Sequence, residues 1–338
     1  MPDDSAVCNC RRVMIRHFPA AHSPDCASTQ RVGKGAMAAL QSPIGSRRRL
    51  GAELRRLRVK AAMTLDEVAE RMTCSTSKIS RLETGKGIPK VPDVRELMRI
   101  YGVVSDTERD MLLRLVRDGR EHGWWESYTE GVQPERFVLD SPSRYAALET
   151  EAVKVRSFEL TLLNGLLQTT DYTRAVLTAL LGSARGSQEI ERLVELRRRR
   201  QQALSDPEQP LELAVVFDEG ILQRVVGTHA VMAEQLDVVL ERTELPNVTV
   251  QVLPLEAGLH RAHLGSFVIL EFLEDMDSDV VHIEGHAGDT YLEVKSDVDR
   301  YKDVHTDVSA RALDVVATRE LIRRYQHEHT ARARKARP

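Results

Sequence analysis

Hydroxyl-bearing and cationic side chains gather in one short stretch of the chain, residues 75–84 (Ser-Thr-Ser-Lys-Ile-Ser-Arg-Leu-Glu-Thr). If this stretch is helical, Ile79 and Leu82 share its inward side. Its outward side then carries Thr76, Ser77, Lys78 and Arg81. Hydroxyl, ammonium and guanidinium groups hydrogen-bond the phosphate oxygens and base edges of nucleic acids. The stretch therefore predicts a polar helix face with the chemistry of nucleic-acid recognition.

Capping signals frame this helix and the one before it. Thr64 and Glu67 form the pattern of a capping box, and apolar residues at helical spacing follow them. After a break at residues 73–75, Ser75 is a suitable N-cap for the second helix, and Gly85 supplies the positive φ that ends it. Two short helices, a tight turn and a polar outer face predict a helix-turn-helix, whose second helix enters a DNA major groove.

The segment resembles the phage-repressor or XRE type of helix-turn-helix domain, in which Ser-Lys-Ile-Ser-Arg-Leu-Glu is a familiar recognition-helix string. Helical patterns at residues 93–101 and 106–117 complete an all-α domain of five helices over residues 46–118. The resemblance implies that three residues of the second helix face base edges: Thr76, Ser77 and Arg81. An arginine at such a position forms a bidentate pair with guanine, worth about 1–3 kcal/mol of discrimination.

Two further residues match the family pattern. Arg58 and Glu83 stand where XRE-type domains have an arginine late in the first helix and a glutamate after the recognition helix. The resemblance implies that the two form an ion pair and that Arg58 also reaches a DNA phosphate; the alternative is a purely structural pair. Leu65 departs from the pattern, because the family frequently has a phosphate-binding glutamine there.

Charge is divided unevenly along the chain. From Ser46 to Lys90 there are 12 Lys and Arg against 5 Asp and Glu, a net charge of +7, whereas residues 91–330 carry −16. A basic module joined to an acidic body favours nucleic-acid binding through one patch. Residues 46–60 predict an amphipathic helix with a cationic outer face, for which a merely solvated face is the alternative. We expect phosphate contacts from Arg47, Arg48, Arg55, Arg58, Lys60, Lys78 and Lys86.

Residues 1–45 show no hydrophobic period and predict a disordered tail. Cysteine and histidine in the tail raise the alternative of a zinc site, at Cys8, Cys10, Cys26, His17 and His22, although Cys-x-Cys is not a usual ligand spacing. A second hypothesis places the native start at Met37, so that residues 1–36 would not belong to the native protein. The tail lacks the apolar core of a secretory signal, and no run approaches ~18 apolar residues. We therefore expect a cytoplasmic protein without a membrane span.

Enzyme motifs are weak. Ser75 and Lys78 match the Ser-x-x-Lys pattern of penicillin-recognising acylases, but this string fills a recognition helix and its partner motifs are missing. Four histidines in the second half lack a His-Glu-x-x-His arrangement: His260, His263, His282 and His286. We expect no enzymatic activity, no cofactor and no metal site; the alternative is a metal-dependent enzyme fused to a DNA-binding module.

The second half of the chain has another pattern. Residues 119–150 contain both tryptophans and predict a linker or packing segment. Residues 151–325 predict an α+β domain with a mostly antiparallel sheet. Its strands are expected at 152–160, 211–217, 248–253, 267–272, 280–283 and 290–294, and its helices start near 167 and cover 188–204, 230–242 and 297–325. Residues 326–338 predict a basic, frayed tail.

This second half resembles the C-terminal domain of WhiJ-like regulators, actinobacterial XRE-type proteins that are also described as antitoxin-like. The resemblance rests on Leu166-Leu-Gln-Thr-Thr-Asp-Tyr-Thr-Arg-Ala-Val-Leu and Leu245-Pro-Asn-Val-Thr-Val-Gln-Val-Leu-Pro, among other strings. It implies a sequence-specific transcriptional regulator. We expect a homodimer on a palindromic double-stranded operator, assembled through residues 119–325. The alternative is an antitoxin-like protein that binds a small partner protein and uses DNA binding for autoregulation.

Overall fold

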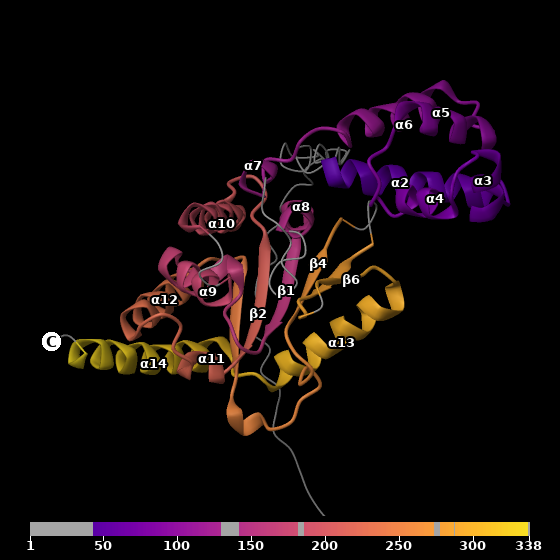
Figure 1. Ribbon diagram of the computed structural model, residues 1–338. Helices are drawn as coiled ribbons and strands as arrows, with labels where there is room; N and C mark the ends of the chain where they lie inside the picture. The colour runs from indigo at the N-terminus through magenta and orange to yellow at the C-terminus, as the bar shows by residue number, and fades with distance from the viewer. Residues whose placement is uncertain (1–42, 130–141, 182–185, 274–277, 287, 337–338) are drawn as a thin grey trace, which may run out of the picture. The chain divides into compact units, whose positions relative to one another are not determined.

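The computed structural model describes residues 43–129, 142–181, 186–273, 278–286 and 288–336 (Figure 1). Within those ranges a helical part is followed by a part built around a β-sheet. No helix in the described ranges is both long and apolar enough to span a bilayer.

The helical part has the five helices predicted from the sequence. They are α2 (Pro43–Lys60), α3 (Leu65–Arg71), α4 (Thr76–Glu83), α5 (Val91–Ile100) and α6 (Asp106–Asp118). One apolar core joins them, and its most buried members include Leu54, Val68, Ile79, Leu97 and Leu112. Helix α2 begins at Pro43 rather than at Ser46. Proline suits the first turn of a helix, because the N–H it lacks would have no partner there.

The second part contains a six-stranded mixed sheet in the order β3-β2-β1-β4-β5-β6. The strands are β1 (Lys154–Glu159), β2 (Glu212–Asp218), β3 (Val248–Leu253), β4 (Phe267–Glu271), β5 (Val280–Ile283) and β6 (Thr290–Leu292). Antiparallel pairs join β1 to β4, β4 to β5 and β5 to β6. The predicted α+β class with a mostly antiparallel sheet is therefore confirmed. The parallel pairs of β2 with β1 and β3 were not predicted.

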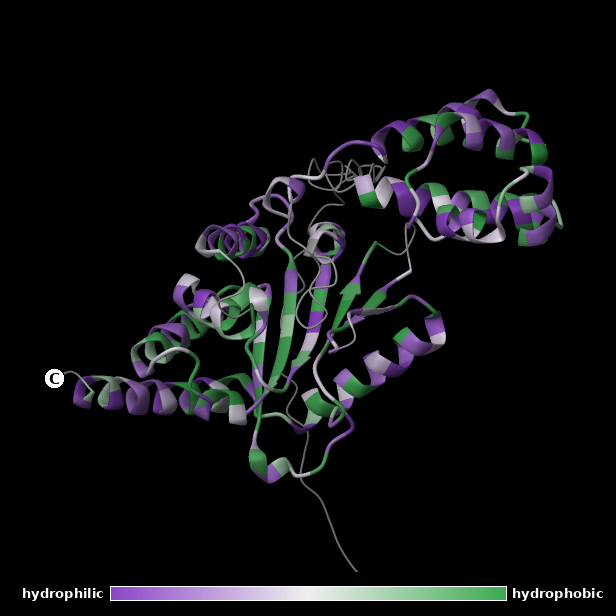
Figure 2. Ribbon diagram, in the orientation of Figure 1, coloured by the Kyte–Doolittle hydropathy of each residue, from purple (hydrophilic) through white to green (hydrophobic). Residues whose placement is uncertain are grey.

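Helices cover both faces of the sheet. On one face, the core includes Val155, Val215 and Val250 of the sheet and side chains of α9 (Thr170–Leu181), α12 (His229–Arg242) and α14 (Val315–Lys335). On the other face, Phe158, Val216 and Ile269 pack with Val298 and Val308 of α13 (Lys295–Arg311). Figure 2 shows that β2 and β4 are hydrophobic along most of their length, as expected of strands covered on both faces, whereas β1 also carries hydrophilic residues.

Further helical elements complete this part. They are α7 (Glu126–Thr129), α8 (Pro142–Glu151), η1 (Gly165–Leu167), α10 (Ser187–Arg200), η3 (Gln201–Ser205), α11 (Gly220–Gln223) and η4 (Leu255–Ala257). Trp125 is 3% exposed and packs with Ala146, Ala147 and Leu193, which supports the packing role predicted for the tryptophan pair. Helix α8 itself was not predicted.

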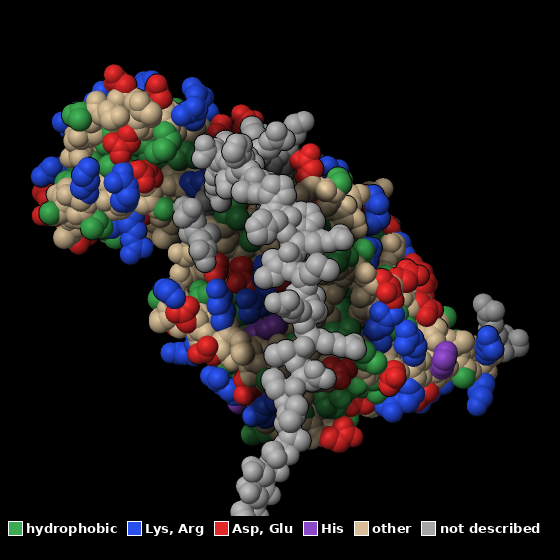
Figure 3. Space-filling view, turned by 180° about the vertical axis from the view of Figure 1, so that it is seen from behind, with side chains coloured by type: hydrophobic (Ala, Val, Ile, Leu, Met, Phe, Trp, Pro, Cys, Tyr) green, Lys and Arg blue, Asp and Glu red, His purple; other side chains and the backbone are tan. Residues whose placement is uncertain are grey.

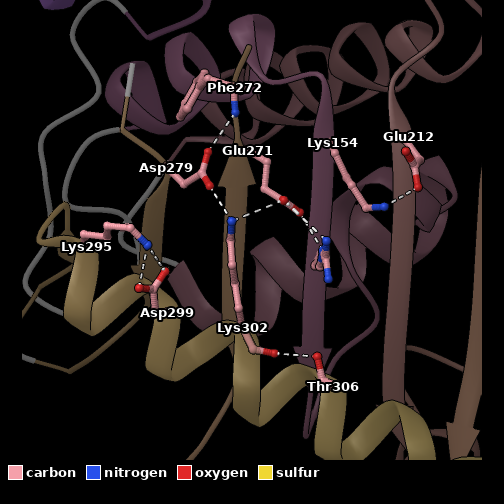
Figure 4. A network of polar contacts seen from close by, with 10 residues as sticks. Lys154, Glu212, Glu271, Phe272, Asp279, Lys295, Asp299, Lys302 and Thr306 are labelled. Atoms are coloured by element: carbon pink, nitrogen blue, oxygen red, sulfur yellow. Dashed lines mark hydrogen bonds and ion pairs between the residues drawn. The ribbon is translucent and has the colours of Figure 1, made fainter. Parts of the chain in front are cut away.

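A polar network holds α13 against the sheet (Figure 4). Lys302 Nζ lies 2.5 Å from Asp279 Oδ2 and 3.4 Å from Glu271 Oε2. Glu271 also accepts a hydrogen bond of 2.6 Å from Arg156 Nε on β1, and Asp279 accepts one of 3.0 Å from the backbone N–H of Phe272. The half-buried charges on this face are thus paired with one another.

The predicted helix 297–325 is in fact two helices. Helix α13 ends at Arg311, and α14 starts at Val315 and runs to Lys335, through the stretch predicted to fray. Asp314 is the N-cap of α14 and accepts a hydrogen bond of 2.8 Å from the N–H of Ala317. The N–H of Leu313 donates to the carbonyl of Val252 on the edge strand β3. The helix is interrupted here because the backbone of Leu313 hydrogen-bonds to the edge strand β3. Asp314 then caps the next helix.

Candidate nucleic-acid interface

The turn between α3 and α4 is fixed by local hydrogen bonds. Thr64 Oγ1 accepts from the N–H of Glu67 at 3.2 Å, and Glu67 Oε2 accepts from the N–H of Thr64 at 2.7 Å, which is the predicted capping box. Ser75 Oγ caps α4 by accepting from the N–H of Lys78 at 3.3 Å. Thr73 has a φ of 51°, in the left-handed region, so the turn reverses within a few residues.

Helix α4 is seated closely on α2. Ile79 is fully buried and Leu82 is 5% exposed, as their spacing predicted. A Cβ atom at Gly51 on α2 would lie 2.6 Å from the carbonyl oxygens of Leu82 and Glu83. Glycine is therefore required at position 51. This requirement was not predicted from the sequence. Gly85, with a φ of 66°, ends the helix as predicted.

Arg58 and Glu83 join the end of α2 to the end of α4. Arg58 Nε lies 2.7 Å from Glu83 Oε1, and Arg58 Nη2 lies 2.9 Å from Glu83 Oε2. Arg58 Nη1 also donates to the carbonyl of Met63 at 2.9 Å. The side chains are only 13% and 5% exposed. The hydrogen bond to Glu83 is the main reason that the pKa of Arg58 is raised. This geometry favours the structural role of Arg58 over a phosphate contact.

The three residues predicted to read bases differ in their availability. Ser77 and Arg81 are exposed on the outer side of α4. In the part of the chain that the structure describes, Arg81 has no carboxylate at ion-pair distance, so its guanidinium is available to a ligand. Thr76 is half-buried, and its hydroxyl donates to Asp66 Oδ1 on α3 at 2.7 Å. Thr76 is therefore oriented by α3 and retains only acceptor capacity.

The predicted phosphate contacts fall into two groups. Arg55, Lys60 and Lys86 are exposed, although Lys86 Nζ lies 3.8 Å from Glu293 Oε1. Lys78 is half-buried, and its Nζ lies 2.9 Å from Asp93 Oδ2 on α5. Figure 3 shows basic side chains spread over the surface of the helical part with acidic ones among them. The interface therefore depends on particular cations rather than on a uniformly basic face.

Arg47 and Arg48 lie at the less accessible side of α2. Arg47 Nε donates to the carbonyl of Gly119 at 2.5 Å, and burial lowers the pKa of Arg47 while Glu126 opposes that shift. Arg48 is 8% exposed. The helical pattern of residues 46–60 predicted that both residues lie on the outer face of the helix. Helical spacing alone does not indicate which other residues pack against the first turns of α2. Arg47 is half-buried and Arg48 is buried, and each guanidinium donates a hydrogen bond to a backbone carbonyl, that of Gly119 and of Ser278 respectively.

The metal alternatives concern two regions. Cys8, Cys10, Cys26, His17 and His22 lie outside the described residues. Within the described ranges, no group of three or more His, Cys, Asp and Glu side chains is placed to hold a metal ion. His282 Nε2 instead lies 3.2 Å from Asp289 Oδ2, as a buried pair.

Comparison with known families gives a match in each part. Residues 49–112 match a helix-turn-helix domain family, and this range includes α3, α4 and the Arg58–Glu83 pair but not Arg47 or Arg48. Residues 142–324 match a domain of unknown function, DUF5753, which includes the whole sheet. No curated protein and no solved structure matches the chain. Since the second match covers more than half of the 338 residues, the chain belongs to the DUF5753 family, with a helix-turn-helix domain ahead of the family domain.

Proposed function

We propose that this protein is a sequence-specific transcriptional regulator that reads a palindromic operator with α4 in the major groove. The observation that carries the proposal is the exposed Arg81 on the outer side of a recognition helix whose seating on α2 and α3 is fixed by caps, close packing and the Arg58–Glu83 pair. The match to a helix-turn-helix family and the resemblance to XRE-type domains support it. The proposal assigns no catalytic role to any residue.

Recognition divides between two kinds of contact. Arg81 supplies bidentate hydrogen bonds to a guanine, and Ser77 supplies a short hydroxyl beside it. Arg55, Lys60 and Lys86 supply phosphate contacts, which place the helix in the groove without carrying sequence information. Thr76 accepts a hydrogen bond from a base only if the group that it meets is a donor, because its own hydroxyl hydrogen is engaged by Asp66.

Two chains act together in this proposal. One helix-turn-helix domain buries too little surface for tight specific binding, and two domains on half-sites about 10 base pairs apart solve that problem. The resemblance to WhiJ-like regulators favours assembly through the DUF5753 domain. The antitoxin-like alternative also uses DNA binding, and copurification of a small protein with the native chain would support it.

The test is selection of bound fragments from random DNA by purified protein. We expect a palindrome from the native protein, and Arg81→Ala should lose base preference at one position of each half-site, with about 1–3 kcal/mol of discrimination lost. The matched control is Arg99→Ala on α5, because Arg99 is paired with Glu96 outside the α3–α4 unit. Recovery of no motif would reject the proposal. An unchanged motif with Arg81→Ala would reject Arg81 as the reading residue.

A further inference from the structure

A cavity of about 150 Å³ lies inside the DUF5753 domain, under α9 and α10. Its floor is the face of the sheet at the end of β1 and the neighbouring residues of β4 and β5, and η1 closes one side. Its wall is apolar on the helix side, with Val176, Leu177, Leu193 and Leu196 among the lining residues. The helix-turn-helix has no part in this cavity.

The floor of the cavity is polar where the sheet pattern calls for core residues. Ser157 and Glu159 alternate with Phe158 and therefore share the face of Val155, which belongs to the main core. His282 of β5 lies on the same face, since Val268 pairs with both Ser157 and His282. The side chains of Ser157, Glu159 and His282 are 0%, 9% and 3% exposed, and Glu159 and His282 line the cavity. Asn164 donates to Ser157 and Glu159 at 3.1 and 2.9 Å, and His282 is paired with Asp289. This part of the sheet face thus carries partnered polar groups instead of apolar core side chains.

Two arginines of α10 reach the cavity, and they differ in their partners. Arg200 makes hydrogen bonds of 2.5 and 2.8 Å to the two carboxylate oxygens of the buried Glu149. Arg197 has a neutral partner, the side-chain oxygen of Gln168, at 2.6 Å. Among the residues that the structure describes, no carboxylate lies within ion-pair distance of Arg197. Burial and the repulsion of Arg200 lower the pKa of Arg197 to about 10, as expected of a desolvated cation without a counter-ion.

The carboxyl groups around the cavity leave this charge largely unbalanced. Burial raises the pKa of Glu159 to about 8, against the hydrogen bonds from Asn164 and Ser157, so its carboxyl group is mostly neutral near pH 7. Asp289 is paired with His282. Glu284 is exposed and acts on Arg197 only at longer range. Among the described residues, the direct partner of Arg197 is therefore the neutral amide of Gln168 rather than a carboxylate.

The polar groups around Arg197 are held in place by other hydrogen bonds. Gln168 donates to the carbonyl of Leu163 at 2.6 Å and accepts from Thr173 at 3.2 Å. Gln201 donates to the carbonyls of Gly165 and Gln168, at 2.9 and 2.7 Å. The arginine is thus positioned by a fixed frame, which lowers the ordering cost of binding a ligand.

We propose that this cavity binds a small monocarboxylate with an apolar body, whose carboxylate pairs with Arg197. The planar guanidinium matches a carboxylate in a bidentate manner, and the neutral acid of Glu159 provides a hydrogen-bond donor nearby. The apolar wall receives the body of the ligand. A cavity of this size accommodates a benzene-sized group, which limits the ligand to roughly six to nine non-hydrogen atoms. Glu284 and Asp289 near the cavity disfavour a dianion such as a phosphate monoester.

The test is calorimetric titration of the full chain, without DNA, with benzoate and 4-methylpentanoate at millimolar concentration. The neutral amides of the two acids and inorganic phosphate are the comparison compounds. We expect the acids to bind and the comparison compounds not to bind. Arg197→Gln should weaken acid binding about tenfold or more, since a hydrogen bond to a charged group is lost. Arg198→Gln should change nothing, because Arg198 is exposed on the same helix and paired with Glu195.

A second variant tests the cavity from its rim. Leu180 is 51% exposed and lines the cavity, so Leu180→Trp should leave the fold intact and weaken acid binding by crowding the apolar end. Amides that bind as well as the acids, acid binding that survives Arg197→Gln, or the absence of acid binding to the native chain would each overturn the proposal. None of these results depends on DNA, so the proposal stands or falls separately from the DNA-binding function.

Discussion

Glu159 is a carboxylic acid on a buried face of the sheet, so its protonation affects the stability of the whole domain. Its pKa is about 8 in the folded chain, compared with an ordinary value of 4.5. Between these values the folded state keeps a proton that the unfolded state has lost. The free energy of unfolding therefore falls as pH rises through this window, by up to about 1.4 kcal/mol per pH unit.

We predict that the DUF5753 domain becomes less stable between pH 6.5 and 8 and that Glu159→Gln removes most of this dependence. The window avoids His305, whose pKa burial lowers from 6.5 to about 4, so that His305 makes stability rise with pH only below 6.5. Urea unfolding at several pH values measures the slope. Glu208→Gln, an exposed acid of the same domain, should keep the native slope. A native slope of zero would contradict the burial argument.

The Arg58–Glu83 pair gives a second prediction at the level of single residues. Glu83→Ala would leave the largely buried Arg58 without its counter-ion, which typically costs about 3–5 kcal/mol. We expect earlier urea unfolding of the helical part, read from hydrogen exchange of α2 and α4 amides. Glu96→Ala breaks the exposed Glu96–Arg99 pair and should have a much smaller effect. Equal effects of the two substitutions would show that the buried pair adds no stability.

Single residues also show what the sequence could and could not reveal. The caps Thr64 and Ser75, and the buried Ile79 and Leu82, are local features with a fixed spacing, and the structure has them where the pattern predicted. The accessibility of Arg48 was not predictable in this way, because it depends on what packs against α2. The polar floor of the cavity was also missed, since it comes from residues on separate strands.

Elements were predicted most reliably where their own period is strong. Strands β3 and β5 have the predicted bounds, because both are short runs of β-branched residues. Helix α8 was missed, since its buried face is made largely by Ala146, Ala147 and Leu148 and its period is weak. The order of the strands could not be predicted from the sequence, because the parallel pairing of β1, β2 and β3 depends on how the connecting helices cross the sheet.

The break between α13 and α14 leads to a prediction at this scale. Asp314→Ala removes the side chain that caps α14, and such a loss costs about 1 kcal/mol. We expect faster hydrogen exchange in the first turn of α14, around Thr318, and a small fall in the unfolding temperature of the domain. Asp297→Ala is the control, because Asp297 is in the first turn of α13 and is not its N-cap. Equal protection of Thr318 in the two variants would argue against Asp314 as the element that sets the boundary.

Over the whole molecule, the charge is divided between a basic stretch and an acidic remainder. Such a division directs a polyanion to one part of the chain, because the acidic part repels it. Several cations of the helical part are already paired with carboxylates, namely Arg56, Arg58, Lys78 and, more loosely, Lys86. The salt dependence of DNA binding should therefore reflect the exposed, unpaired cations rather than the total positive charge.

Two neighbouring arginines of α2 make this prediction testable. Arg55 is exposed, whereas Arg56 lies 2.5 Å from Glu53 and 2.7 Å from Glu108. If Arg55 binds a phosphate, Arg55→Gln should reduce the slope of log K against log salt by about 0.9 for each bound chain, and therefore by about 1.8 for a dimer on its operator. Arg56→Gln should leave the slope nearly unchanged, since its charge is already balanced. Fluorescence anisotropy with the selected operator measures both slopes, and a stoichiometric titration gives the number of chains bound. A change of about 0.9 with one chain bound would reject the dimer, and equal slopes for the two variants would reject Arg55 as a phosphate contact.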